Sequence, residues 1–240
     1  MAMRVNKKSL RALPVILLLE SLTSVGAVIG VIIAALIRPF IGALLANSIM
    51  LFEGGVYLVI WILGSAFVYG LMDLSRDFKY SWYLHITWLI LKTVVQVVES
   101  ISMFMDQGMD TGTANVFRIV SEVLSAVQQF TGMAAIAFAM MGLFKVLQKK
   151  GEHALGAGCR KFVYFYMIVG ILLALTDFVD LLLKSIFPGF GSEYSVGYLP
   201  VVIVYAIIQI ALFLASVPAF FTAGRSCRRI YFMLQGIQEI

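Results

Sequence analysis

The sequence predicts an all-α integral membrane protein, a bundle of about six transmembrane helices. Of its 240 residues, 61% are hydrophobic and only 13% are charged, whereas a soluble domain carries about 25% charged residues. The hydrophobic residues form continuous runs close to the roughly 20 residues that cross a bilayer. A transmembrane β-barrel would show short alternating segments instead.

Six apolar segments are separated by polar or Gly/Pro-containing stretches. The predicted spans are approximately 13–37, 50–72, 82–105, 116–144, 162–186 and 197–223. No connecting stretch is long or polar enough for a soluble domain, so residues 1–240 are expected to form a single polytopic membrane domain. The basic N-terminus is similar to a signal peptide, but Glu20 interrupts the apolar run and no small-residue cleavage site follows. The first span is therefore expected to be retained.

The region between the first two spans has the least regular pattern. Arg38-Pro39 ends the first helix, because a residue that precedes proline avoids the α-helical conformation. A single helix over 40–72 would be about 50 Å long, too long for a bilayer at ordinary tilt. The sequence therefore predicts a short interfacial or re-entrant helix near 40–52, broken at Gly54-Gly55; a long tilted helix is the alternative.

The basic residues predict the orientation of the bundle. If both termini are cytoplasmic, the cytoplasmic segments hold 14 of the 18 Lys and Arg residues. The opposite loops, 106–113 and 188–195, hold none. This bias follows the positive-inside rule.

The net charge of +5 does not indicate nucleic-acid binding, because the basic residues form short clusters between apolar spans. Cys159 and Cys227 fall in segments expected to lie outside the spans in the cytoplasm, where free thiols are the rule.

Three consecutive predicted spans carry polar residues at helical spacing, so each set shares a helix face. The principal candidates for a substrate or proton site are Lys92, Gln96 and Glu99 in the third span, Arg118 and Glu122 in the fourth, and Asp177 and Asp180 in the fifth. A Lys at a helix centre costs roughly 2.5–3.5 kcal/mol, while each Leu, Ile or Val returns only about 0.3–0.6 kcal/mol. Such residues therefore face a partner or water.

These polar stripes allow two interpretations. With Glu53 and Lys184 added, five acidic residues face three basic ones, so an outward-open cavity would suit a cationic or zwitterionic solute, or protons. Alternatively, the charges are ion pairs that hold the helices together, with Lys92–Asp177 and Arg118–Glu99 as candidate pairs.

Glu20 and Glu53 are secondary candidates. Glu20 lies in the inner half of the first span, where it could bind a proton or accept hydrogen bonds from Ser21, Thr23 or Ser24. His85 is the only histidine in a span, and a lone histidine is more often a hydrogen-bonded interfacial residue than a ligand. No metal site and no cofactor are predicted.

No catalytic or phosphate-loop signature occurs, so no enzymatic activity is predicted. The leading hypothesis is a multi-pass transporter or permease-like component of a bacterial plasma membrane, with a mildly acidic site among the third to fifth spans. An ATP-driven role would need a separate ATPase or other membrane subunit. The alternative is a non-transporting membrane scaffold, regulatory or immunity-type protein, in which the charges are structural.

Overall fold

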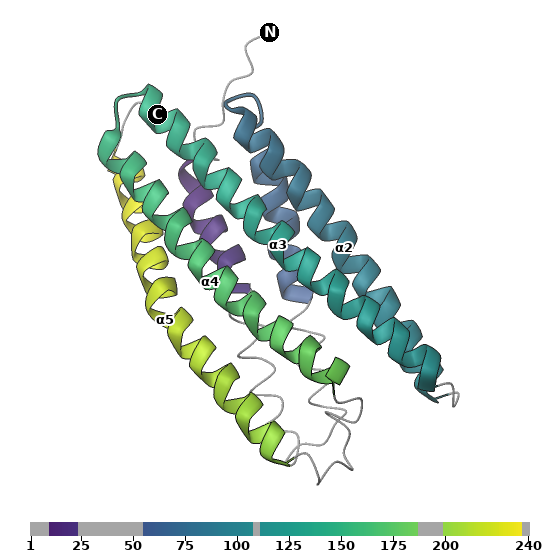
Figure 1. The fold of residues 1–240 in the computed structure, drawn as a ribbon. Coiled ribbons are helices and arrows are strands. Elements are labelled where there is room, and N and C mark those ends of the chain that lie inside the picture. Colours follow the sequence, from purple (N-terminus) through teal and green to yellow (C-terminus); the bar gives the residue numbers. More distant parts are fainter. Residues whose placement is uncertain (1–9, 24–54, 108–110, 187–198, 237–240) are drawn as a thin grey trace.

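Helices make up almost all of the chain that the computed structural model describes, namely residues 10–23, 55–107, 111–186 and 199–236 (Figure 1). Within these ranges there are six helices and no strand. The helices are residues 10–23, Gly55–Tyr69, α2 (Arg76–Gln107), α3 (Thr111–Lys149), α4 (His153–Ile186) and α5 (Leu199–Gly236).

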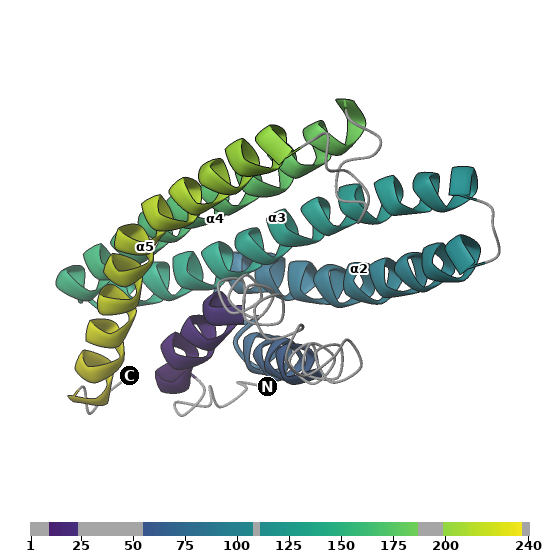
Figure 2. The same cartoon turned by 90° about the horizontal axis from the view of Figure 1, so that it is seen from below.

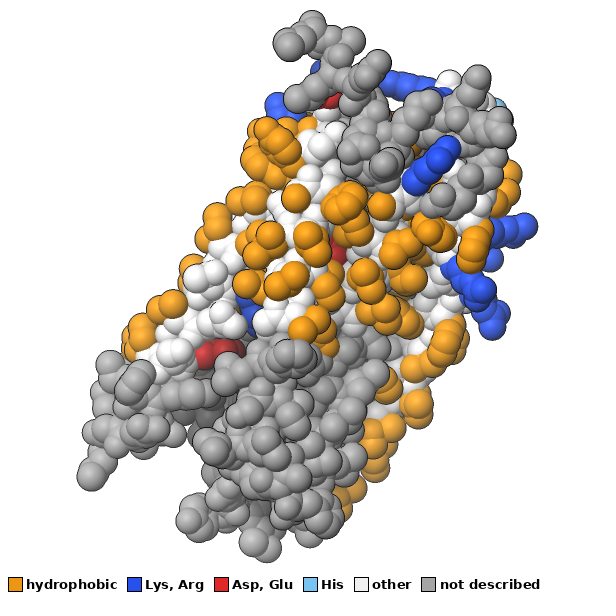
Figure 3. Space-filling view, turned by 180° about the vertical axis from the view of Figure 1, so that it is seen from behind, with side chains coloured by type: hydrophobic (Ala, Val, Ile, Leu, Met, Phe, Trp, Pro, Cys, Tyr) orange, Lys and Arg blue, Asp and Glu red, His pale blue; other side chains and the backbone are white. Residues whose placement is uncertain are grey.

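Four of these helices are long and apolar enough to cross a membrane. The segments that meet this criterion are Arg76–Ile101, Ile119–Lys149, His153–Leu172 and Ile210–Leu234. Hydrophobic side chains are also spread over the described surface seen from behind (Figure 3), as expected of helices that face lipid. The predicted all-helical fold is therefore confirmed for the described residues, and four of their helices have the length and hydropathy of transmembrane helices.

The finer prediction of six spans stays a prediction. Helix Gly55–Tyr69 is apolar but shorter than a full span, and helix 10–23 covers only the first part of the predicted span 13–37. The short helix predicted near 40–52 lies outside the described residues.

The long helices pack in chain order. α2 packs against α3, α3 against α4, and α4 against α5 (Figures 1 and 2). The start of helix 10–23 and the last turns of α5 lie at the end of the bundle where residues 70–75 and 150–152 connect helices (Figure 1). We call this the basic end, since most of the Lys and Arg side chains visible in Figure 3 lie in that half of the molecule.

Local sequence signals set the helix boundaries at the basic end. The Ser75 hydroxyl accepts a hydrogen bond from the Asp77 amide at 3.2 Å, so Ser75 acts as the N-cap of α2. At the end of α3, Gly151 has a positive φ of 80°, and the Glu152 amide donates to the Leu147 carbonyl at 3.0 Å. This is the glycine-based Schellman ending of a helix.

An ion pair joins these two helix ends. Lys145 Nζ lies 2.7 Å from Asp77 Oδ2, which ties the last turns of α3 to the first turn of α2. The Lys145 side chain is half exposed, so solvent screening keeps its contribution to stability small.

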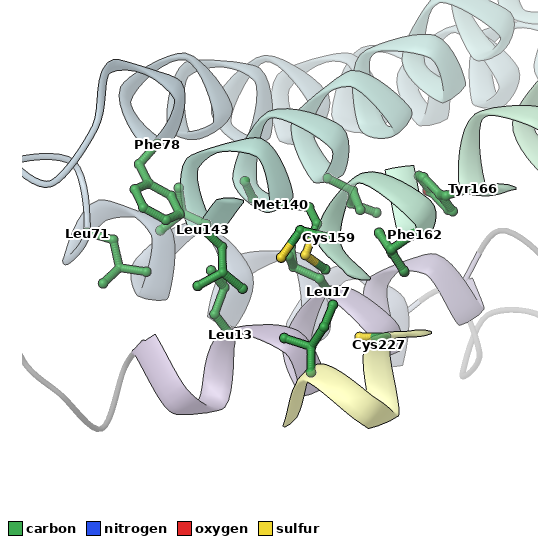
Figure 4. Packing of buried hydrophobic residues seen from close by; sticks show 14 of the residues in the cluster. Leu13, Leu17, Leu71, Phe78, Met140, Leu143, Cys159, Phe162, Tyr166 and Cys227 are labelled. Atoms are coloured by element: carbon green, nitrogen blue, oxygen red, sulfur yellow. The ribbon is translucent and has the colours of Figure 1, made fainter. Parts of the chain in front are cut away.

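Helix 10–23 packs one face against the buried core of the basic half of the bundle (Figure 4), while Leu19 and Leu22 on its other face are exposed. Its Leu13 and Leu17 are fully buried, and the Pro14 carbonyl accepts a hydrogen bond from the Cys227 thiol at 2.7 Å. Cys159 and Cys227 are free, and both are buried inside α4 and α5. They were expected outside the spans, but these helices extend further toward the basic end than hydropathy indicated.

Gly132 of α3 permits a close approach of three helices. The Trp61 and Trp88 rings are stacked, with centroids 4.1 Å apart and planes at 11°. A Cβ on Gly132 would come within 2.9 Å of both rings. Helix Gly55–Tyr69 and α2 can therefore pack this closely against α3 only if position 132 is a glycine.

Gly132→Ala is expected to lower the free energy of unfolding by about 1–3 kcal/mol, because two packed indole rings cannot move aside for a methyl group. Thermal unfolding of the purified protein in detergent measures the effect. Gly224→Ala is the matched control, since a Cβ there meets only Leu18 Cδ1 at an ordinary 3.8 Å. Equal stability of the two variants would contradict the close packing at Gly132.

Candidate functional site

The described part of the bundle contains a fully buried acid–base pair. His85 Nε2 of α2 lies 3.0 Å from Glu20 Oε1 of helix 10–23, and both side chains are 0% exposed. The two residues are 65 positions apart in the sequence. Ionisable groups are expensive in this environment unless they are paired, so this pair is the principal candidate site.

The contacts of the other imidazole nitrogen determine where the protons are. His85 Nδ1 lies 2.8 Å from the Ser81 carbonyl, which can only accept a hydrogen bond. The Ser81 hydroxyl, 3.3 Å from Nδ1, donates its own proton to the Ala135 carbonyl at 2.7 Å. Both neighbours of Nδ1 are thus acceptors, so Nδ1 carries a proton.

It follows that Glu20 and His85 share one further proton. With Nδ1 protonated, a neutral imidazole leaves a lone pair on Nε2, which would face the lone pairs of a carboxylate. The contact at 3.0 Å is favourable only if a proton lies between Nε2 and Oε1. The pair is therefore either imidazolium–carboxylate or imidazole–carboxylic acid, and it is neutral in both forms.

Backbone geometry lets the Glu20 carboxyl group reach this position. A Cβ on Gly64 would overlap Glu20 Oε1, so the carboxyl group lies directly against the backbone of helix Gly55–Tyr69. Any residue with a side chain at position 64 would push the carboxyl group away from His85. Gly64 is thus a positioning residue for the pair.

Aromatic and hydroxyl side chains enclose the pair. The Trp61 ring lies 5.2 Å from the His85 ring, and Trp61 Nε1 donates to the Thr23 hydroxyl at 3.2 Å. Thr23 in turn donates to the Glu20 backbone carbonyl at 2.6 Å. The network contains groups from helix 10–23, helix Gly55–Tyr69, α2 and α3, so four helices fix the position of one proton-sharing contact.

The second carboxyl oxygen of Glu20 is buried, and no described residue forms a hydrogen bond with it. A buried acceptor without a partner costs about 1–3 kcal/mol. The carboxylic acid form, or a donor that reaches Oε2, would lower this cost. This oxygen distinguishes the site from an ion pair whose hydrogen bonds are all satisfied.

The sequence hypothesis for Glu20 was partly wrong. Ser21 and Thr23 were candidate donors to the carboxyl group, but Ser21 donates to the Leu18 carbonyl and Thr23 to the Glu20 backbone carbonyl. Helical geometry directs both hydroxyls to backbone acceptors one turn earlier. His85 is hydrogen-bonded as expected, and its side chain is fully buried among the helices.

The predicted stripe in the third span lies on α2. Gln96 and Glu99 are exposed, and Lys92 is partly buried. None of these three side chains has a hydrogen bond or ion pair with another described side chain. Val97, the neighbour of Gln96 in the sequence, is 53% exposed.

The remaining candidates lie on α3 and α4. Glu122 is partly buried on α3 and makes an interaction within the chain. Arg118 lies on α3, and Asp177 and Asp180 lie on α4, but the placement of these three side chains is outside the description. The two ion pairs suggested by the sequence therefore stay predictions. Glu53 also lies outside the described residues.

Sequence reasoning missed the partner of Glu20, although a signal was present. Glu20 and His85 each lie in the first third of their predicted spans, counted from the end that the positive-inside rule predicts to be cytoplasmic. Two spans that both begin at that end place such residues at similar depth. A lone intramembrane acid and a lone intramembrane histidine at one depth are natural partners.

The described residues contain no group of three or more His, Cys, Asp or Glu side chains that could hold a metal ion. Comparison of the chain with protein-family models, with curated proteins and with solved structures finds no match.

The shared proton can be tested by nuclear magnetic resonance, because the chain has only two histidines, His85 and His153. With ¹⁵N-labelled imidazoles, we expect His85 Nδ1 to give a protonated signal, assigned by comparison with the His153→Gln variant. In Glu20→Gln, the Nε2 signal should shift strongly while Nδ1 stays protonated. An unprotonated Nδ1 in the wild-type protein would contradict the proton assignment.

Proposed function

We propose that this chain is a proton-coupled transporter or a permease-like component of a cell membrane, with Glu20–His85 as its protonation site. The basic end faces the cytoplasm in this proposal, in agreement with the positive-inside rule, and helix 10–23 and helix Gly55–Tyr69 belong to two further spans. The bacterial plasma membrane is the proposed location.

The observation that carries this proposal is the buried, proton-sharing contact between Glu20 and His85 at 3.0 Å. Ionisable residues inside membrane helices commonly mark proton relays and ion pathways. A second proton can be gained at Glu20 Oε2, which no described donor occupies; the imidazolium would then face a neutral carboxylic acid, and the attraction between Nε2 and Oε1 would be weaker. Protonation would thus weaken the interaction between helix 10–23 and α2. A change of this kind can couple proton binding to a movement of the helices.

The solute site remains among α2, α3 and α4 in this proposal. Among the candidate charged residues of those helices, four carboxylates outnumber three cations, which suits a cationic or zwitterionic solute: Glu99, Glu122, Asp177 and Asp180 against Lys92, Arg118 and Lys184. An ATP-driven variant of the proposal requires a separate ATPase subunit, because the sequence has no phosphate-binding loop.

One observation favours a second candidate, a non-transporting scaffold, regulatory or immunity-type protein. Gln96 and Glu99 are exposed on α2 next to exposed Val97, and polar groups that face lipid are costly. A partner membrane protein that covers this face would supply hydrogen bonds to the stripe. In this case Glu20–His85 serves only to hold the helices together.

Water access to the stripes discriminates between the two candidates. Single cysteines at positions 96, 99, 122, 177 and 180, introduced after replacement of Cys159 and Cys227 by alanine, would be treated with a membrane-impermeant thiol reagent from each side. The transporter proposal expects several positions to react from the outside, because a solute site must be hydrated. If all five stay unreactive while cysteines in the loops react, the scaffold candidate is favoured.

Proton coupling is tested in proteoliposomes that contain a pH-sensitive dye. A gradient of a transported cationic or zwitterionic solute is expected to drive proton movement in the wild-type protein, and Glu20→Gln should abolish it. Gly64→Ala, which keeps both partners but displaces the carboxyl group, should reduce it strongly. Lys149→Ala is the control, since Lys149 is exposed at the basic end. Undiminished proton movement in folded Glu20→Gln would refute the assignment.

A further inference from the structure

The last turns of α5 carry a cluster of three arginines. Arg225, Arg228 and Arg229 are exposed, and their spacing of three and four residues places them on neighbouring turns of one helix face. The 26 residues that precede them in α5, 199–224, contain no charged residue. At 1.5 Å per residue this uncharged stretch is about 39 Å long, enough to cross the hydrocarbon core and place the arginines at its boundary.

The opposite face of the same turns is buried, which fixes the direction of the arginines. Ala223, Cys227, Ile230 and Leu234 are all at most 2% exposed, and the Cys227 thiol is bonded to the Pro14 carbonyl of helix 10–23. Figure 2 shows that α5 bends along its length, and Pro218 within it removes a backbone hydrogen bond, the usual cause of such a bend. The arginine face is thus held outward by packing.

Apolar side chains border the arginines. A shallow hollow of about 470 Å³ is lined by Arg225, Arg228, Arg229, Phe232 and Met233. The Arg228 guanidinium lies 5.5 Å from the centre of the Phe232 ring, and Phe232 and Met233 are 59% and 41% exposed. The surface therefore combines a strong anion-binding group with groups suited to the edge of the acyl-chain region.

No described carboxylate neutralises this cluster. The ion pairs Glu20–His85 and Asp77–Lys145 do not involve an α5 arginine, and the three arginines form no ion pair with a described carboxylate. The other exposed basic residues of this end are mainly lysines, whereas this cluster is purely arginine. Guanidinium groups bind phosphate in a bidentate manner, which the ammonium group of lysine cannot do.

We propose that Arg225, Arg228 and Arg229 form a binding site for the phosphate headgroup of an anionic phospholipid of the cytoplasmic leaflet. The orientation rests on the topology proposed above, but the site is independent of Glu20–His85 and of transport. A lipid explains both halves of the surface: its phosphate pairs with the guanidinium groups, and its acyl chains cover Phe232 and Met233. A soluble phosphate compound would leave the apolar groups exposed.

The full chain in neutral detergent would be titrated with dioctanoyl phosphatidylglycerol, and binding followed by thermophoresis. Dioctanoyl phosphatidylcholine and inorganic phosphate serve as ligand controls. The triple variant Arg225→Gln/Arg228→Gln/Arg229→Gln is expected to bind phosphatidylglycerol roughly 100-fold more weakly, because each basic residue near an anionic surface strengthens binding about fivefold. If the triple variant does not fold, the single Gln substitutions test the same site, and each is expected to weaken phosphatidylglycerol binding about fivefold.

The matched control is Arg76→Gln/Lys79→Gln/Lys149→Gln, which removes three exposed positive charges from the same end of the bundle. It should change the affinity much less than the α5 variant, because screening limits distant charges. Equal losses in the two triple variants would overturn the proposal in favour of a general charge effect. Equal binding of phosphatidylcholine, or full displacement by inorganic phosphate, would also overturn it.

Discussion

The contact between Glu20 and His85 constrains much of the surrounding structure. In a low-dielectric interior an unpaired carboxylate or imidazolium is too costly to keep, so the two side chains must meet. They come from helices far apart in the chain, and their 3.0 Å contact requires close approach of the intervening backbone. Gly64 has no side chain because Glu20 Oε1 occupies that space. The fold near the basic end is built around this requirement.

The same requirement extends to the aromatic stack. Trp61 borders His85 and stacks on Trp88, and the pair of rings rests on Gly132 of α3. Glycine, indole and imidazole groups from helix Gly55–Tyr69, α2 and α3 thus pack directly against one another. Small residues have this role in membrane interiors generally, because helix association there depends on packing and hydrogen bonds more than on exclusion of water.

Two exposed surfaces of the molecule differ in the chemistry of their side chains. The outer part of α2 exposes Gln96 and Glu99 beside Val97, a polar stripe that suits a hydrated path or a partner protein. The end of α5 exposes arginines beside Phe232, which suits an interface rich in phosphate. The buried pair lies apart from both surfaces, so coupling between the pair and a solute would have to pass through movement of the helices themselves.

The sequence by itself determined the helical membrane class, the approximate position of the long helices and the clustering of basic residues, because hydropathy and charge are properties of local segments. Residue spacing also identified Lys92, Gln96 and Glu99 as one stripe. Only the tertiary structure joined Glu20 to His85, assigned the His85 proton through Ser81, and gave Gly64 and Gly132 their roles. These features depend on distances between helices, and neither hydropathy nor periodicity along one chain specifies which faces of different helices meet.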